Sequence, residues 1–537
     1  MVYNTVHHGA PHRPGTNTGN VFSHMQSIVL NRSIRPLWWL YAAAALSLLT
    51  TLNLPYVGEE AVYTITTLEM WANREFFLTT LYGTSYPRPP FLNWLVILLA
   101  NLLGWEHVLQ ASRLVTAAAT AATGVVLAWL TAHLTRNHML AAFAALVYLS
   151  GDVLFYRGWL AYADSLFTLC VFAAIACTWV AVERNRPWLI WVGMIALTCG
   201  FLTKVQTAYV FYGVALAALF WRRDYRRVLL RPASVSAHLA GAAAFVLWNR
   251  YVVHGVHSSG AVTDIVLKFQ TAGLANYLNQ LWTFPLETVL RFLPASALAA
   301  WWWWRSRGAP QDRRAALPLA LLAGMTAVNF LPYWIGPQSH IRYIMPLYPL
   351  IALIIACLIW QAGEARLRFA VRWLAAAIAL KYLLGLWAFP AYQEKFRGNY
   401  AAAAADIVAR TRGFPLYVTD VSATGLSVAA HIDTLRLPAP PLRWPPQAWD
   451  HGFVLSYTAS PELGQLARRY ALGGNELYLL CRGAACGLEK GEGSRKWGVE
   501  GSVFHSPLPA IPPLFSASIV SMAAITRVAG NCCRQSL

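Results

Sequence analysis

Two adjacent carboxylates, Glu59 and Glu60, follow an apolar segment, and a single arginine between two prolines, Arg88, comes after them. A carboxylate in this setting could take a proton from an acceptor hydroxyl, and a guanidinium could hold a phosphate. A structural interpretation is also open, because acidic residues favour a helix N-terminus and an arginine at a bilayer surface extends towards headgroups. Spacing alone leaves both interpretations open.

Further polar groups stand at the borders of later apolar runs, namely Asp164, Lys204, His340 and Arg342. An aspartate in that position could support the glutamates or cap a helix, and the two roles are compatible. The basic groups could stabilise a phosphate as it leaves, or could extend to lipid headgroups. Asp152 is expected within or near the end of a span, and the sequence offers no partner for it.

The composition excludes an ordinary soluble protein. Hydrophobic residues make up 57% of the 537 residues and charged residues 12%, with a mean hydropathy of +0.44. Soluble proteins carry about a quarter charged residues. The formal charge of +19 could suit nucleic acid, but the chain is too apolar for that partner. The 24 Trp and 24 Tyr suit a membrane interface, so we expect a polytopic α-helical membrane protein.

Eleven membrane spans are expected after a cytoplasmic tail over residues 1–35. The spans cover residues 36–54, 112–132, 139–156, 164–182, 187–201, 205–221, 233–252, 284–304, 315–333, 343–361 and 369–389. The apolar segment 91–105 is left out, since crossing the hydrocarbon core takes about 20 residues. Leaving it out also places the basic interspan loops in the cytoplasm, whereas counting it would place them outside. We expect it at the membrane surface or as a re-entrant helix.

An odd number of spans places the C-terminal part on the outer side, together with the first loop. The expected domains are a transmembrane domain over 36–390 with its first outer loop over 55–111, a small α/β domain over 391–486, and a tail without a recognisable pattern over 487–537. In the α/β domain the patterns predict helices over 399–410 and 461–470 and strands over 414–420, 452–457 and 476–481. An alternative is a twelfth span over 511–525.

The first outer loop carries a series of motifs in a fixed order. They are Glu59-Glu60, Tyr63, Glu69-Met70, Gly83 with Tyr86, Arg88-Pro89-Pro90-Phe91 and Trp94-Leu95. This series resembles the first periplasmic loop of the GT-C glycosyltransferases that use polyprenyl-phosphate sugars, the superfamily of the protein O-mannosyltransferases and the lipid A aminoarabinose transferase. Glu59 replaces the usual Asp and Arg88 the usual Lys, so both charges are kept, and arginine would hold phosphate in a forked manner. Weaker matches surround Asp164, Lys204 and Arg342.

The resemblance implies transfer of a sugar from a polyprenyl phosphate to a hydroxyl of lipid A, a glycan or a protein, with inversion, on the periplasmic face of the inner membrane. Glu59 would be the base or would orient the acceptor. The implied site comprises the catalytic carboxylates Glu59, Glu60 and Asp164, the donor-phosphate residues Arg88, Lys204, His340 and Arg342, and the substrate-lining Tyr63, Tyr86 and Tyr343. No nucleotide motif stands out, and we expect no cofactor and no nucleic-acid partner.

Three alternatives remain from the residues themselves. A secondary transporter would suit the number of spans, with Asp152 as an ion ligand, although no repeated halves are visible. A donor-binding protein without turnover is a second alternative. A metal on His254, His257 and Asp264 is a third, although their spacing is not diagnostic.

Cys481 and Cys486 lie five residues apart at the end of a predicted strand. An oxidising outer compartment and a glycine in the short loop between them favour a local disulfide. Two free thiols are the alternative. Nothing nearby would activate a thiolate, so we expect no catalytic part for this pair.

Overall fold

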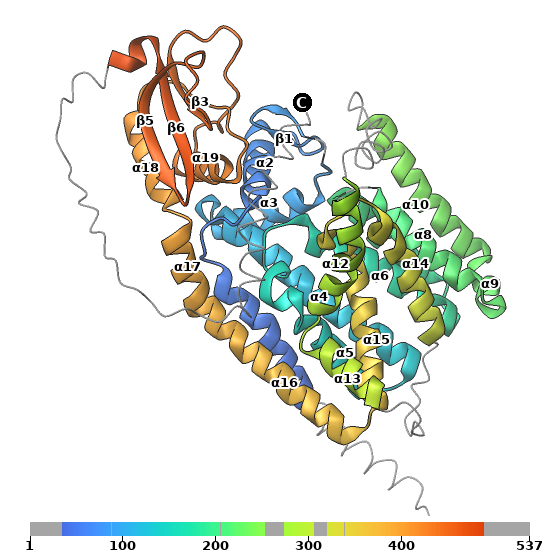
Figure 1. Ribbon diagram of the computed structural model, residues 1–537. Coiled ribbons are helices and arrows are strands. Elements are labelled where there is room, and N and C mark those ends of the chain that lie inside the picture. The colour runs from blue at the N-terminus through green and yellow to red at the C-terminus, as the bar shows by residue number, and fades with distance from the viewer. Residues whose placement is uncertain are drawn as a thin grey trace, which may run out of the picture.

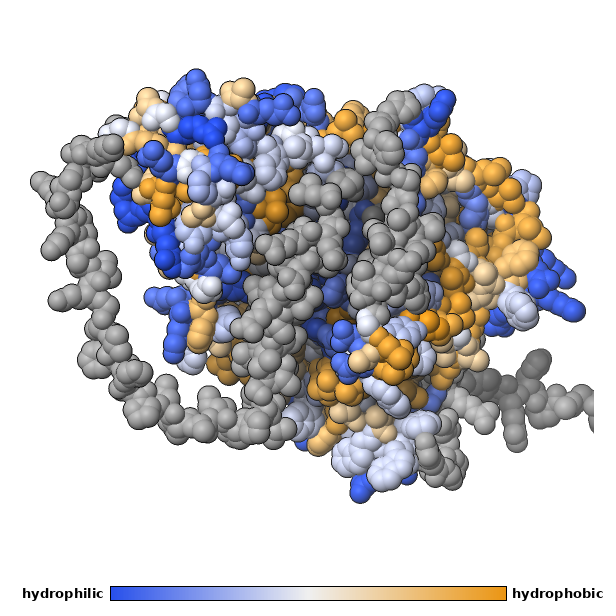
Figure 2. Space-filling model, turned by 45° about the horizontal axis from the view of Figure 1, so that its top comes forward, coloured by the Kyte–Doolittle hydropathy of each residue, from blue (hydrophilic) through white to orange (hydrophobic). Residues whose placement is uncertain are grey.

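The computed structural model describes residues 35–86, 88–204, 206–252, 273–305, 319–337 and 339–487. Most of them form a bundle of helices, and a small α/β domain stands at one end of it (Figure 1). Figure 2 shows hydrophilic surface over that domain and hydrophobic surface over helices on the opposite side of the molecule. The expected helical class is confirmed, and a four-stranded sheet with two helices follows the bundle in the chain.

The chain enters the first loop from a helix over residues 35–47 and the short η1 (Leu48–Thr51). The loop holds α2 (Glu60–Asn73), the hairpin of β1 (Thr80–Leu81) and β2 (Thr84–Ser85), and α3 (Phe91–Leu103). Gly58, with φ of +63°, turns the chain directly before α2. This conformation favours glycine, and the acidic residue in the first turn of α2 suits a helix N-terminus.

Within the described residues, each of the eleven predicted spans contains helix. The helices of the bundle are η2 (Trp105–His107), α4 (Val108–Thr135), α5 (His138–Leu149), the π-turn η3 (Val153–Arg157), α6 (Ala163–Arg184), α7 (Trp188–Thr203), α8 (Thr207–Phe220), α9 (Arg223–Leu229), α10 (Pro232–Tyr251), α12 (Leu274–Leu290), α13 (Ala295–Arg305), α14 (Leu319–Ile335), η4 (Ile341–Leu347), α15 (Tyr348–Gln361), α16 (Glu364–Leu383), the π-turn η5 (Leu384–Ala388) and α17 (Phe389–Phe396). The predicted span 284–304 is wrong as one helix, since α12 and α13 divide at Pro294, which has no N–H to continue a helix.

The helices of the predicted spans fall into two groups by length. Within the described ranges, four helices are long and apolar enough to cross a membrane, or five if the bent pair α9 and α10 counts as one span. The four are Trp105–Thr135, Ala163–Arg184, Ile341–Gln361 and Glu364–Phe396. Other predicted spans, α5 among them, are shorter apolar helices like α3. Length therefore does not distinguish α3 from those shorter spans. The reason to leave α3 out of the membrane spans is the charge of the loops.

Reporter fusions test this arrangement of spans. A reporter fused after Gly398, beyond the end of α17, is expected to be active outside the cytoplasm, as is one inserted near Leu98 in α3. A reporter near Arg226, in the arginine-rich α9, is expected inside because cytoplasmic loops hold the basic residues. A cytoplasmic signal from the Gly398 fusion would contradict an odd number of spans.

The α/β domain is built on one mixed sheet with strand order β3-β4-β6-β5. Its elements are α18 (Tyr400–Arg410), β3 (Leu416–Val418), α19 (Ala423–Leu435), β4 (Gly452–Ser456), β5 (Gln465–Leu472), β6 (Asn475–Arg482) and η6 (Gly483–Gly487). Strands β3 and β4 are parallel, and the other pairs are antiparallel. The domain begins after α17, which carries the preceding helix through Phe396 and so moves the predicted boundary at residue 390.

The predicted helix over 461–470 is wrong, because this segment forms most of β5. The cause lies just beyond it, where Gly473 and Gly474 adopt φ of +58° and +82° between the paired Leu472 and Asn475. Two residues with positive φ make the tight turn that joins two antiparallel strands. The hairpin with β6 therefore overrides the local pattern. Helix α19 was not predicted either.

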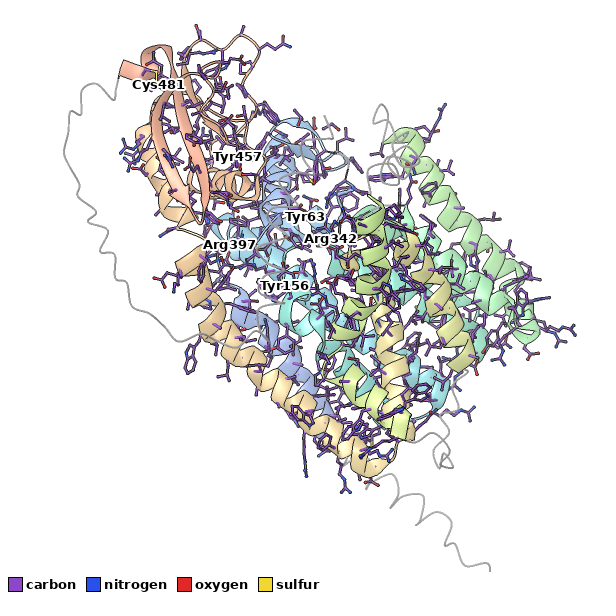
Figure 3. All side chains as sticks on the ribbon, viewed as in Figure 1. Tyr63, Tyr156, Arg342, Arg397, Tyr457 and Cys481 are labelled. Atoms are coloured by element: carbon purple, nitrogen blue, oxygen red, sulfur yellow. A yellow bond between two sulfur atoms is a disulfide. The ribbon has the colours of Figure 1, made fainter. Side chains whose placement is uncertain are left out.

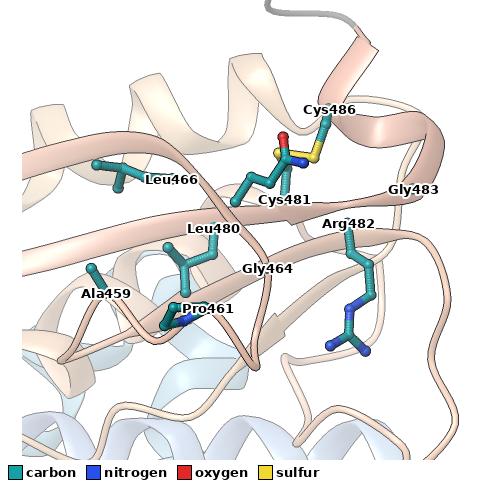
Figure 4. A pocket seen from close by; sticks show the side chains of 10 residues that line it. Ala459, Pro461, Gly464, Leu466, Leu480, Cys481, Arg482, Gly483 and Cys486 are labelled. Carbon is teal, nitrogen blue, oxygen red and sulfur yellow. A yellow bond between two sulfur atoms is a disulfide. The ribbon is translucent and has the colours of Figure 1, made fainter.

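The predicted disulfide between Cys481 and Cys486 is confirmed. It joins the end of β6 to η6 beside a pocket of about 660 Å³ (Figure 4). Arg482 in this pocket is engaged, since its Nη1 donates to the carbonyl of Trp449 at 3.0 Å and its Nη2 to that of Glu462. The pair fastens the edge of the domain.

The first loop and the α/β domain share one hydrophobic core. Tyr56, Ile65 and Tyr82 of the loop are buried with residues of α18, α19 and the sheet. The Tyr82 hydroxyl donates to the carbonyl of Asp420 at 3.2 Å, and the Trp444 N–H donates to the carbonyl of Tyr82 at 3.1 Å. The domain thus holds the loop that carries the first site residues.

Asp433 of α19 makes this domain sensitive to pH. Its Oδ1 accepts from the Leu442 N–H at 2.7 Å, whereas its buried Oδ2 has no hydrogen-bond partner within the described residues. Burial raises its pKa from 3.8 to about 7. Because the folded pKa lies above the unfolded one, this group's stabilisation is complete below about pH 4 and is lost as the pH rises towards 7.

Asp433→Asn is therefore expected to raise the melting temperature at pH 8 by several degrees and to leave it nearly unchanged at pH 4, since the amide keeps the acceptor without the charge. Thermal unfolding of the purified protein at both pH values measures this. Asp450→Asn, at an exposed position of the same domain, is the control. An equal gain at both pH values would contradict the role of ionisation.

Candidate active site

A buried ion pair anchors the start of α2. Arg113 of α4 donates from Nε to Glu60 Oε1 at 3.0 Å and from Nη2 to Oε2 at 2.5 Å, and both side chains are fully buried. Arg113 also donates to the carbonyls of Thr51, Leu52, Leu54 and Pro55. Glu60 further accepts from the N–H groups of Val57 and Ala161, each at 2.8 Å. The pair joins the first span, α4 and the turn before α6.

Glu60 is therefore a structural carboxylate, and its predicted place among the catalytic groups is corrected. Its two oxygens accept four hydrogen bonds and are closed to solvent. A group engaged in this way is not free to contact a substrate. Adjacent residues at the start of a helix point in different directions. The sequence does not show which of the two glutamates points into the protein, so spacing could not distinguish Glu60 from Glu59.

Glu59 has the opposite environment. Tyr162 holds its backbone, since the Glu59 N–H donates to the tyrosine oxygen at 2.9 Å and that hydroxyl donates to the Val57 carbonyl at 3.1 Å. A Cβ at Gly58 would lie 2.6 Å from the same oxygen, so the close approach requires glycine. The Glu59 side chain is 47% exposed, and its Oε2 lies 3.7 Å from Nη1 of Arg342. The backbone of Glu59 is therefore held in place, while its carboxylate is partly exposed to solvent.

Asp164 lies in the first turn of α6 and forms an ion pair with Lys204 at the end of α7. The Lys204 ammonium also lies 5.1 Å from the centre of the Tyr343 ring and 5.8 Å from that of Phe167. The Arg342 guanidinium lies 5.5 Å from the Tyr343 ring. Tyr343 of η4 thus lies within reach of both cations. The predicted group of Asp164, Lys204, Arg342 and Tyr343 is brought together from three helices.

Arg88 completes the group from the first loop. It donates to the hydroxyl of Tyr63, and its guanidinium lies 5.5 Å from the Tyr63 ring and 5.4 Å from the Tyr86 ring. In the part of the chain that the structure describes, no carboxylate lies within 4.0 Å of it. Electrostatic interaction with Tyr63, as the largest cause, raises the pKa of Arg88. Figure 3 labels Tyr63 and Arg342 below the α/β domain, where the first loop meets the bundle.

His340 is exposed and lies directly before η4, with its ring 5.7 Å from that of Tyr343. It is therefore at the border of the group. The balance of charge across the site is positive, since Arg88, Lys204 and Arg342 face Glu59 and Asp164. Such an arrangement favours an anion next to one partly open carboxylate.

Sequence reasoning missed three residues of this region. Arg113 anchors the start of α2 through Glu60, Tyr162 holds the Glu59 backbone, and Arg157 adds a cation that acts on Asp164. The buried Nε of Arg157 has no hydrogen-bond partner within the described ranges. Arg113 and Arg157 each lie next to an outer segment, and this position was the only indication in the sequence. The sequence does not show whether an arginine side chain points into the protein or towards solvent.

Asp152, which the transporter alternative used as an ion ligand, has a partner. Its Oδ1 accepts from Nη1 of Arg291 at 2.6 Å, and Arg291 also pairs with Glu287 at 2.5 Å. This pairing ties η3 to the end of α12. The metal alternative on His254, His257 and Asp264 lies outside the described residues. Among those described, no three His, Cys, Asp or Glu side chains are grouped as metal ligands.

Comparison with known proteins supports the GT-C type of fold that the sequence motifs predict. The family model of dolichyl-phosphate-mannose-protein mannosyltransferase matches residues 87–251. The chain is similar in structure to ArnT from Cupriavidus metallidurans bound to undecaprenyl phosphate, with a TM-score of 0.60 and 16% identity over 82% of this chain and 97% of that one. For the apo state of that ArnT, the TM-score is 0.59 with 14% identity, over 83% and 98% of the two chains.

These TM-scores show a shared fold over nearly the whole length of that ArnT. No curated protein matches the sequence. The expected resemblance to ArnT and the protein mannosyltransferases is confirmed, and the chain is a multi-pass membrane protein.

Proposed function

We propose that this protein transfers a sugar from a polyprenyl phosphate to an acceptor hydroxyl at the outer face of the inner membrane. The observation that carries the proposal is the pairing of one partly open carboxylate, Glu59, with a surplus of cations that includes Arg88. A sugar phosphodiester needs both a base for the acceptor and positive charge for the departing phosphate. The similar ArnT binds undecaprenyl phosphate, which supports a lipid-linked donor for this chain.

The reaction is a single displacement at the anomeric carbon. Glu59 takes the proton of the acceptor hydroxyl, and the acceptor oxygen forms the new bond to that carbon. The bond from the carbon to the phosphate oxygen breaks, and its electron pair leaves with the polyprenyl phosphate. Arg88, Lys204 and Arg342 stabilise this charge. One attack from the side opposite the leaving group inverts the configuration.

The remaining groups have supporting parts in this proposal. Asp164 holds Lys204 in place through their ion pair, and Tyr63 orients Arg88 through its hydroxyl. Glu60 and Arg113 act beneath the site and keep the Glu59 backbone in position. The phosphate charge is met by protein cations, so we expect transfer to persist in the presence of a chelator.

Arg88→Ala is expected to weaken donor use roughly 10- to 100-fold, the size of a lost charge-assisted hydrogen bond, with little effect on acceptor use. Arg342→Ala should act in the same direction. Initial rates at varied donor and acceptor concentrations separate the two effects. Arg74→Ala, which removes an arginine exposed at the end of α2, is the control. Equal losses on both substrates would assign Arg88 a structural role.

The sugar and the acceptor can be identified by comparing cells with and without the protein. Mass analysis of membrane lipids and envelope glycans should show one modified species that disappears in the deletion strain and returns with the intact gene. Its return with a Glu59→Gln copy would contradict the proposed role of this carboxylate. An unchanged set of lipids, glycans and glycoproteins would contradict the proposed function.

A further inference from the structure

A groove of about 530 Å³ runs between α8 and α14, and none of the residues that line it belongs to the proposed active site. Its walls are apolar and include Val214, Ala218, Met325 and Val328. The Val328 side chain is 55% exposed, so the groove faces the outside of the bundle. In a membrane protein, such a surface is in contact with lipid.

One end of this groove has a different chemistry. Trp221 and Arg222, at the junction of α8 and α9, line it there. Trp221 is 84% exposed, and the Arg222 guanidinium lies 4.9 Å from the centre of the Tyr225 ring. An exposed tryptophan beside an arginine is typical of the depth at which acyl chains meet headgroups. The groove is thus apolar along its length and positively charged at one end.

More positive charge lies next to Arg222. Residues 222–231 contain five arginines and one aspartate, and Arg223, Arg227 and Arg231 are exposed. Tyr225, Val228 and Leu229 of α9 are buried against the protein, and α9 meets α10 at an angle of 69°. This short helix lies at the end of α10 farther from the α/β domain in Figure 1. An arginine-rich helix at this position favours anionic headgroups.

We propose that the α8–α14 groove binds one anionic phospholipid, with an acyl chain between the helices and the phosphate headgroup against Arg222 and the arginines of α9. A zwitterionic headgroup brings its own ammonium, which these arginines repel. The ligand belongs to the leaflet opposite the proposed donor, because α9 and the labelled site residues Tyr63 and Arg342 lie towards opposite ends of the bundle (Figures 1 and 3). The site is thus separate from the site for the sugar donor.

Two glycines allow a matched test of the groove. A Cβ added at Gly324 of α14, which lines the groove, would meet no heavy atom within 4 Å, and the same holds for Gly213 of α8, which does not line it. Gly324→Leu therefore fills the groove without a clash at Cβ, and Gly213→Leu adds the same side chain elsewhere on the apolar surface. Both changes favour helix formation.

The experiment is native mass spectrometry of the purified full chain with phosphatidylglycerol or phosphatidylethanolamine of identical acyl chains. The intact protein should retain one phosphatidylglycerol with about a tenfold preference over phosphatidylethanolamine. Gly324→Leu should lose this retention and Gly213→Leu should keep it, while Arg222→Gln should reduce the preference. Equal retention of the two lipids by the intact protein, or unchanged retention by Gly324→Leu, would overturn the proposal. The measurement does not depend on sugar transfer.

Discussion

Glu59→Gln is expected to lower the rate of sugar transfer by about 10²- to 10⁴-fold, the range for loss of a general base. Glutamine keeps the shape of the side chain and removes its proton-accepting charge. The backbone contact with Tyr162 does not involve the changed group, so the protein should remain folded and inserted. Single-turnover transfer by the purified variant measures the loss.

A control and a graded variant sharpen this result. Glu75→Gln changes an exposed glutamate just after α2 and should leave transfer unchanged. Glu59→Asp introduces the residue usual in the resembling family and should retain part of the activity, because the charge stays while its reach shortens by one methylene. Full activity of Glu59→Gln would leave Glu59 only a role at the start of α2.

Arg113→Met is expected to destabilise the protein by about 3–5 kcal/mol, the usual effect of removing one partner of a buried ion pair. The change leaves the Glu60 carboxylate buried without its counter-charge and also frees the carbonyls of Thr51, Leu52, Leu54 and Pro55. Thermal unfolding in detergent should show a clearly lower melting temperature than for the intact protein.

The double variant Arg113→Met with Glu60→Gln should regain part of this loss, since it no longer buries an unpaired charge. Arg368→Met, at an exposed position of α16, is the control for loss of an arginine. A melting temperature for Arg113→Met equal to that of the control would show that the pair does not anchor α2.

The helices and most of the site were predictable from sequence for different reasons. Long apolar runs favour helices whatever their neighbours, so each predicted span contains helix in the described residues, although span 284–304 is divided between α12 and α13. Glu59, Asp164 and Arg88 were found through a series of motifs, not through any single spacing. The distinction between Glu59 and Glu60 was not predictable, because it depends on Arg113, which is 53 residues away in the chain.

The α/β domain was less predictable because long-range pairing decides its structure. The segment that ends at Tyr470 became strand β5 through its hairpin with β6. The docking of the first loop on α19 also joins residues more than 300 positions apart, as in the contact of Tyr82 with Asp420. No local pattern in either segment indicates that contact.

The release of polyprenyl phosphate by purified protein is the most direct measurement of the proposed chemistry. Undecaprenyl phosphates carrying different sugars would be incubated with the protein and an envelope extract as the source of acceptor, and the released lipid phosphate quantified by mass spectrometry. We expect release from one sugar donor by the intact protein and almost none by Glu59→Gln. No release from any donor, or equal release by the variant, would contradict transfer at the Glu59 site.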